Sequence, residues 1–177
     1  MIGPTHFLLG AAAAIPAAAL AHQPWLVAVG FLGGLWPDLD LSETTLSNWR
    51  LMISAPAKGR RAVYVRPFGW LGALAQSTGE HRGWWHSLPA ALLFSAVAIW
   101  LIGPLGGLAF LGGYLSHLLG DAATVSGVEI LPGRRWHLLP SGWRLKTGAP
   151  LEHLISALAA ISLLFYLLPL LLNGLSY

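Results

Sequence analysis

Histidine and carboxylate side chains recur at the ends of the apolar runs of this 177-residue chain. The chain contains no cysteine, so any metal bound by its side chains must be held by imidazole and carboxylate groups. Such ligands suit Zn(II), Mn(II) or Fe(II) in a hydrolytic site. The candidate residues are His6, Asp38, Asp40, His81, His86, His117, Asp121 and Glu152.

The most informative spacing is that of His117-Leu-Leu-Gly-Asp121. Side chains four residues apart lie on the same face of a helix. One metal could therefore take both groups, or Asp121 could bridge two metals. An isolated pair of this kind is more often a hydrogen bond within a helix, and Glu152 alone could be a dipole partner at a helix start. The number of such groups favours the metal site.

Two further motifs depend on how the chain enters or leaves a helix. His81 and His86 would lie about 140° apart around an ideal helix, so both reach one site only if His81 is in the preceding loop. Pro37-Asp38-Leu39-Asp40 is expected to leave its helix as an extended piece, on which positions two apart share a side. Asp38, which is nearest the helix, is the first choice as a ligand, although either aspartate could instead pair with an arginine.

The composition indicates that these groups belong to an integral membrane protein. Hydrophobic residues make up 55% of the chain and charged residues 10%, against about 25% charged in an average soluble domain. The mean hydropathy is +0.63. These values exclude a disordered chain, a collagen-like fibre and an ordinary soluble globule. The length suits a single membrane-embedded domain over residues 1–177.

Five apolar runs predict an all-α fold of about five transmembrane helices, with two polar loop segments over one face. Tight turns at His22-Gln23-Pro24 and Gly103-Pro104 join two pairs of runs. Many small residues in the runs predict close helix packing and no chemistry of their own. The runs are Phe7–Ala21, Pro24–Trp36, Trp84–Ile102, Pro104–Gly120 and Leu154–Leu172. The first two are short for a full crossing.

All ten lysine and arginine residues fall in two polar segments, Asp38–Arg82 and Asp121–Glu152. If all five runs cross the bilayer, both segments and the N-terminus lie on one side. The positive-inside rule predicts that this side is cytoplasmic, with Tyr177 outside. The candidate ligands would then meet at one membrane face. The net charge of +3 is explained by these loops, and no nucleic-acid partner is expected.

Several motifs resemble those of the YdjM-like family of predicted inner-membrane metal-dependent hydrolases. The resemblance runs in order along most of the chain and implies a metal-dependent hydrolase of the inner membrane. The matching motifs are Thr5-His6, Pro37-Asp38-Leu39-Asp40, His81-Arg82-Gly83-x-x-His86-Ser87, Gly113-Tyr114-Leu115-Ser116-His117-x-x-x-Asp121 and Thr147-Gly148-x-x-x-Glu152.

The order of ligands is also similar to that of zinc-dependent phospholipase C and P1-type nucleases. This similarity implies metal ligation by His6, Asp38, His81, His86, His117 and Asp121. The soluble enzymes also use the free amine of a processed chain, whereas Met1 here precedes His6 by five residues. Their later His-x-x-x-Glu motif is absent, since Gly148 stands four residues before Glu152. One or two ions, most simply zinc, are therefore expected.

These inferences together predict a hydrolase of phosphoester bonds in a membrane lipid or lipid-linked substrate. Arg82 would bind phosphate as a planar bidentate donor. Asp40 or Glu152 would act as a general base or would orient a ligand. The alternative is a non-enzymatic protein that transports or senses a divalent metal, but the apolar runs offer few polar groups for an ion path. A purely structural role would leave the clustered histidines unexplained.

Overall fold

The computed structural model describes residues 1–40, 51–54, 63–65, 84–131 and 134–174. Five α-helices dominate this part of the chain: α1 (Gly3–Ala13), α2 (Ile15–Leu20), α3 (Trp25–Leu35), α5 (Leu88–Ala122) and α6 (Pro150–Gly174). Three short 3-10 helices and four strands complete it: η1 (Trp36–Asp40), β1 (Leu51–Ser54), β2 (Val63–Val65), η2 (Trp84–His86), β3 (Val128–Leu131), β4 (Arg134–Trp136) and η3 (Ser141–Trp143).

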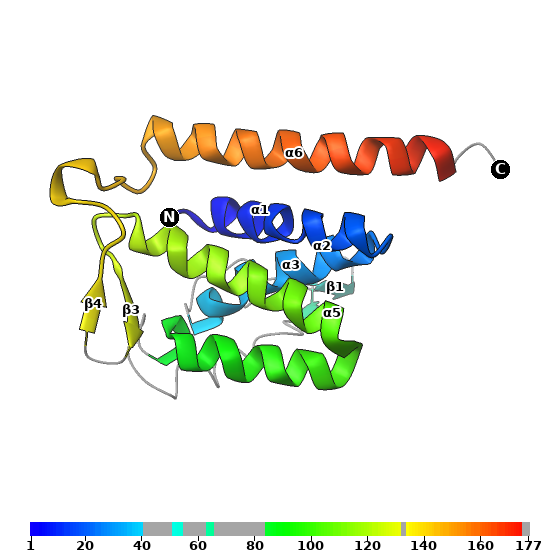
Figure 1. Cartoon of the computed structure of the whole chain (residues 1–177), viewed down its shortest axis with the longest axis horizontal. Helices are drawn as coiled ribbons and strands as arrows, with labels where there is room; N and C mark the ends of the chain where they lie inside the picture. Colours follow the sequence, from blue (N-terminus) through cyan, green and yellow to red (C-terminus); the bar gives the residue numbers. More distant parts are fainter. Residues whose placement is uncertain (41–50, 55–62, 66–83, 132–133, 175–177) are drawn as a thin grey trace, which may run out of the picture.

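The longest helix, α5, is a helical hairpin. Gly103 has φ 83° and ψ 172°, which interrupts the helix and reverses its direction (Figure 1). Glycine adopts positive φ without a steric penalty, and the proline that follows disfavours a helical conformation at Gly103. The two arms, residues 88–102 and 104–122, correspond to the third and fourth apolar runs. The turn expected at Gly103-Pro104 is therefore present.

Three segments of the described chain are long and apolar enough to cross a membrane. They are Gly3–Leu20, Leu88–Ala122 and Pro150–Leu172, with mean hydropathies of 1.3, 2.0 and 2.4. The prediction of a helical membrane protein is confirmed, but five spans are not supported. The run over residues 24–36 forms only the 11-residue helix α3, about 16 Å long, and this is roughly half of a hydrocarbon core.

Helices α1, α3 and α5 pack with their backbones in direct contact. A Cβ atom added to Gly113 of α5 would lie 2.0 Å from the Gly30 carbonyl oxygen of α3. One added to Gly10 of α1 would lie 2.5 Å from the same oxygen. In lipid, apolar side chains gain little by meeting one another, so close backbone approach is what brings helices together. This crossing fixes the relative positions of α1, which carries His6, of α3, which leads into Asp38, and of α5, which carries His117 and Asp121.

The polar segments are not simple loops, so the fold is not purely α-helical. β1 pairs with β2 and β3 pairs with β4, each as a two-stranded antiparallel sheet. These strands are short and contain residues that favour strands, such as the β-branched Val63, Val65 and Val128. They were not predicted from the sequence, because apolar runs of membrane length carry no signal for strands this short.

Helix α6 lies along the outside of this packed unit (Figure 1). Its N-terminal part contacts the start of α1 through polar groups. The carboxylate of Glu152 accepts a hydrogen bond from the Ile2 amide, and the hydroxyls of Thr5 and Ser156 lie 2.8 Å apart. Most other α6 side chains are exposed, as expected for a helix that faces lipid.

Candidate metal centre

Five of the predicted ligands meet at one end of the helices. They form two groups, His6 with His117 and Asp121, and Asp38 with His86 and His117. Within each group, the potential ligand atoms all lie within 4.8 Å of one another. His117 belongs to both groups, so the two groups are parts of one cluster.

The cluster is largely buried, with Asp38 its most exposed member at 13%, and is joined by short contacts. The side chains of His6, His86 and His117 are at most 2% exposed. His6 Nε2 lies 3.2 Å from Asp121 Oδ1, and His86 Nε2 lies 3.4 Å from Asp38 Oδ1. His117 Nε2 lies 3.6 Å from Asp38 Oδ1 and 3.9 Å from Asp121 Oδ2.

The backbone of α3 orients His117. Its Nδ1 lies 2.8 Å from the Gly34 carbonyl oxygen. A carbonyl can only accept a hydrogen bond, so Nδ1 carries the proton and Nε2 keeps its lone pair. Histidine ligands of metals use this arrangement, in which the other ring nitrogen donates to a carbonyl. Gly34 is one of the small residues for which the sequence predicted close packing and no chemistry, because a backbone acceptor leaves no signal in the residue type.

His86 is held where the chain enters α5. It ends the 3-10 helix η2, and the Ser87 hydroxyl then caps α5 by accepting a hydrogen bond from the Ala90 amide at 3.3 Å. The Tyr114 hydroxyl donates to the Trp85 carbonyl. Tyr114 lies one turn before His117 on α5, so this bond places His86 beside His117.

Asp38 reaches the cluster in a conformation that differs from the prediction. Residues Trp36–Asp40 form the 3-10 helix η1 rather than an extended piece. A 3-10 helix has three residues per turn, so Asp38 and Asp40 do not share a side. Burial raises the pKa of Asp38, whereas the neighbouring imidazoles, above all that of His86, lower it by more. The pKa of this carboxyl therefore lies below its ordinary value, and Asp38 is an anion at neutral pH.

Two buried ring nitrogens indicate that the cluster fits a metal ion. Among the described residues, neither His6 Nδ1 nor His117 Nε2 has a hydrogen-bond partner. Leaving a buried polar atom unpaired costs roughly 1–3 kcal/mol, so such atoms need an explanation. The two rings also stack at a centroid distance of 3.7 Å. Imidazole nitrogens beside two carboxylates are a suitable donor set for a divalent cation.

Glu152 lies next to the cluster but outside both groups. It is fully buried, and its two carboxylate oxygens accept hydrogen bonds from the backbone amides of Ile2 and Gly148. The Gly148 amide lies 2.7 Å from Glu152 Oε2. The amino group of Met1 lies 2.8 Å from Asp121 Oδ1. His81, Arg82 and the side chain of Asp40 lie outside the described residues.

The packed helices and the buried histidine–aspartate cluster define a helical membrane protein with a candidate metal centre. The chain belongs to the YdjM inner membrane protein family, whose sequence pattern matches residues 1–175. No curated protein and no solved structure matches the chain. The expected family and the inner-membrane location are therefore confirmed, but the family description names no enzymatic activity, and similarity to phospholipase C or P1 nucleases finds no support.

Proposed function

We propose that this protein is a membrane-embedded, metal-dependent hydrolase that cleaves phosphoester bonds in a lipid or lipid-linked substrate. The observation that carries this proposal is the pair of buried histidine–aspartate groups that share His117. Ionisable groups at membrane depth cost several kcal/mol unless they pair or bind something. A structural role alone would not require three histidines and two aspartates to meet in one largely buried cluster.

Each group would hold one divalent ion, with zinc the first choice and manganese or iron the alternatives. His6 and Asp121 would contribute to one site, Asp38 and His86 to the other, and His117 lies between them. An ion in such a site supplies Lewis acidity and makes hydroxide available near neutral pH. The two aspartates supply the negative charge that offsets the ions.

Other residues of the chain would bind and orient the substrate. Arg82 would donate two parallel hydrogen bonds to a phosphate group. Asp40 is the candidate general base. Glu152 would act mainly as an orienting residue, since backbone amides occupy its two oxygens. Its bond to Ile2 holds the chain just before His6.

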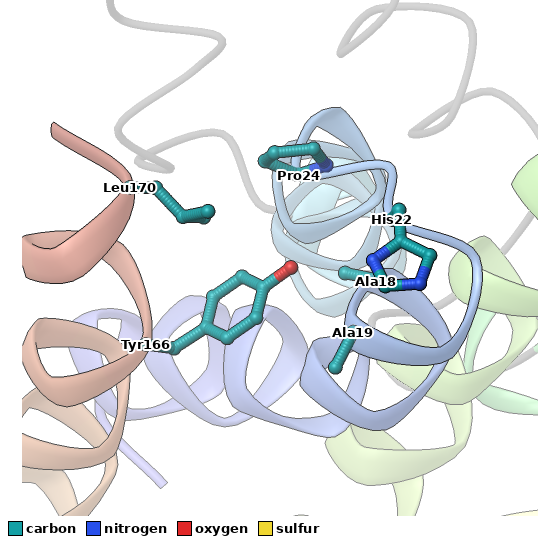
Figure 2. Close-up of a pocket in the computed structure, with 6 residues that line it drawn as sticks. All are labelled: Ala18, Ala19, His22, Pro24, Tyr166 and Leu170. Atoms are coloured by element: carbon teal, nitrogen blue, oxygen red, sulfur yellow. The ribbon is translucent and has the colours of Figure 1, made fainter. Parts of the chain in front are cut away.

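The alternative function, transport of a divalent metal, requires polar groups along a path across the bilayer. The polar side chains of α6 are used locally instead: Ser156 pairs with Thr5, and Ser162 donates to the Leu158 carbonyl. At the far end of α2, Tyr166 and His22 face a cavity of about 250 Å³ (Figure 2). No carboxylate is among the described residues that line it, which favours the hydrolase.

The function is tested by removing and restoring the metal on detergent-purified protein. We expect EDTA treatment to abolish the release of phosphate-containing products from a mixed lipid extract, and added zinc to restore it. The physical reason is that the ion would supply the Lewis acidity and the hydroxide on which the proposed cleavage depends. Lipid products are measured by mass spectrometry, and bound metal by elemental analysis.

The matched control is EDTA already saturated with zinc, which has no capacity left to remove zinc but exposes the protein and detergent to the same chelator. It should leave product release unchanged. Protein that binds zinc stoichiometrically and yet cleaves no phosphoester lipid with any of zinc, manganese or iron would contradict the hydrolase. That result would favour metal sensing or transport.

We propose further that both arms of α5 and the segment α1–α3 cross the bilayer, so that the metal centre faces the cytoplasm. The ten basic residues in the two polar segments support this orientation. Reporter fusions after residues 60 and 135 should then report a cytoplasmic location, and a fusion after Tyr177 an external one. Reporters after residues 60 and 135 on opposite sides would mean that one arm of α5 does not cross. A cytoplasmic C-terminal reporter beside a cytoplasmic reporter after residue 135 would mean that α6 does not cross.

A further inference from the structure

Residues 123–149, here called the interfacial segment, join two of the candidate membrane spans. One span ends at Ala122 and the next begins at Pro150, so both ends of the segment are fixed at the same membrane surface. The segment carries four basic residues, Arg134, Arg135, Arg144 and Lys146, against the single acid Glu129. It therefore has an excess of three positive charges where the chain leaves the bilayer. The proposed hydrolase chemistry uses none of these basic residues.

The same segment exposes large apolar side chains next to these cations. Trp143 is 79% exposed and Leu138 is 59% exposed. The remaining members of this apolar set are Val125, Leu131 and Trp136. All three residues of β4 are exposed, and the guanidinium of Arg134 lies 5.5 Å from the ring centre of Trp136. Exposed tryptophans beside basic residues are typical of surfaces at the headgroup level of a bilayer.

The interfacial segment is attached firmly to the end of α5. The Leu138 amide donates to the Ala122 carbonyl at 2.8 Å, and the Leu145 amide donates to the Ala123 carbonyl at 2.9 Å. The β3–β4 hairpin extends across the ends of the helices, at the same end as the N-terminus and the start of α6 (Figure 1). Its strands therefore lie along the membrane surface, beside the end of the bundle that holds Asp121.

We propose that the interfacial segment is a binding surface for the headgroups of anionic phospholipids in the surrounding bilayer. Its cations attract the phosphate groups, and each basic residue near an anionic surface strengthens the attraction. Its tryptophan and leucine side chains enter the boundary between headgroups and acyl chains. The consequence is a local enrichment of anionic lipid at the end of the molecule that contains the metal centre. This enrichment does not depend on catalysis.

The proposal is tested with a fluorescent label on a single introduced cysteine, since the chain has none of its own. The full-length Ser141→Cys variant is labelled and reconstituted in vesicles that contain either brominated phosphatidylglycerol or brominated phosphatidylcholine. We expect quenching to report a roughly fivefold stronger association with the anionic lipid at low salt, and a weaker preference at high salt. A label on Leu20→Cys, at the far end of α2, should show no preference.

The matched variant combines Arg134→Gln, Arg135→Gln and Lys146→Gln in the labelled protein. These three side chains are exposed, so the fold should persist while the preference falls to about equal quenching by both lipids. Equal quenching in the unsubstituted protein, or an unchanged preference in the triple variant, would overturn the proposal. Absence of quenching by either lipid would place the segment away from the bilayer, as for a protein-binding surface, and would also overturn it. None of these outcomes depends on metal content or hydrolysis.

Discussion

Replacing His117 by alanine should remove metal from the whole cluster and reduce lipid hydrolysis to the background rate. His117 is the only residue common to both groups. Its loss leaves each group with one histidine and one aspartate, too few to offset the dehydration of an ion. Loss of even an outer-shell partner lowers metal affinity about 10–100-fold, so a lost ligand should lower it further. Elemental analysis of the purified protein measures the effect.

The control is His153→Ala, which removes an exposed histidine of α6 that lies next to Glu152 but outside the cluster. It should retain its metal and its activity. Because His117 is fully buried, His117→Gln serves as a second variant of similar size that fills the site without the imidazole. A His117→Gln protein that folds and keeps its full metal content would disprove the proposed site.

Single substitutions also determine how many ions the cluster holds. His6 belongs to one group only, and His86 belongs only to the other. If each group holds an ion, His6→Ala and His86→Ala should each lose about half of the bound metal, whereas His117→Ala loses all of it. If the cluster holds one ion, all three variants should lose metal together.

The convergence of the five side chains could be predicted from the sequence, because it depends only on the helical repeat and on the number of times the chain reverses direction. His117 and Asp121 share a helix face because they are four residues apart. His6, Asp38 and His86 reach the same end because consecutive apolar runs point in opposite directions. The prediction assumed that all five runs cross the bilayer, but the reversals of chain direction are enough to bring these residues to one end, so the short helix α3 does not change this outcome.

What the sequence could not show depends on backbone geometry and on packing between distant segments. The 3-10 conformation of η1 separates Asp38 from Asp40, and residue types in this motif do not distinguish it from an extended end. The Gly34 carbonyl that orients His117 is a backbone atom, so any residue type offers the same acceptor. Glu152 was predicted to be a site residue, but the sequence did not show that the backbone amides of Ile2 and Gly148 donate hydrogen bonds to it. Ile2 comes near Glu152 only in the folded chain.

The same helix crossing that orients His117 should be very sensitive to added volume. Gly113→Ala would place a methyl group 2.0 Å from the Gly30 carbonyl oxygen and 2.9 Å from the Gly34 amide nitrogen. Overpacking a core typically costs about 1–3 kcal/mol. We expect a cost near or above the upper value, because backbone atoms of α3 cannot rotate away as a side chain would. Thermal unfolding in detergent should show a large decrease in Tm.

The neighbouring residue provides the control for this change. A Cβ atom added to Gly112 would lie 3.9 Å from its nearest neighbour, the Ala13 carbonyl oxygen, which is ordinary van der Waals contact. Gly112→Ala should therefore leave the Tm unchanged or raise it, since alanine is favoured over glycine in a helix by about 1 kcal/mol. Equal Tm values for the two variants would show that α3 and α5 are not in backbone contact. Because Gly34 and Gly30 lie on the same helix, Gly113→Ala should also displace the acceptor of His117, and zinc should raise the Tm of this variant less than that of Gly112→Ala.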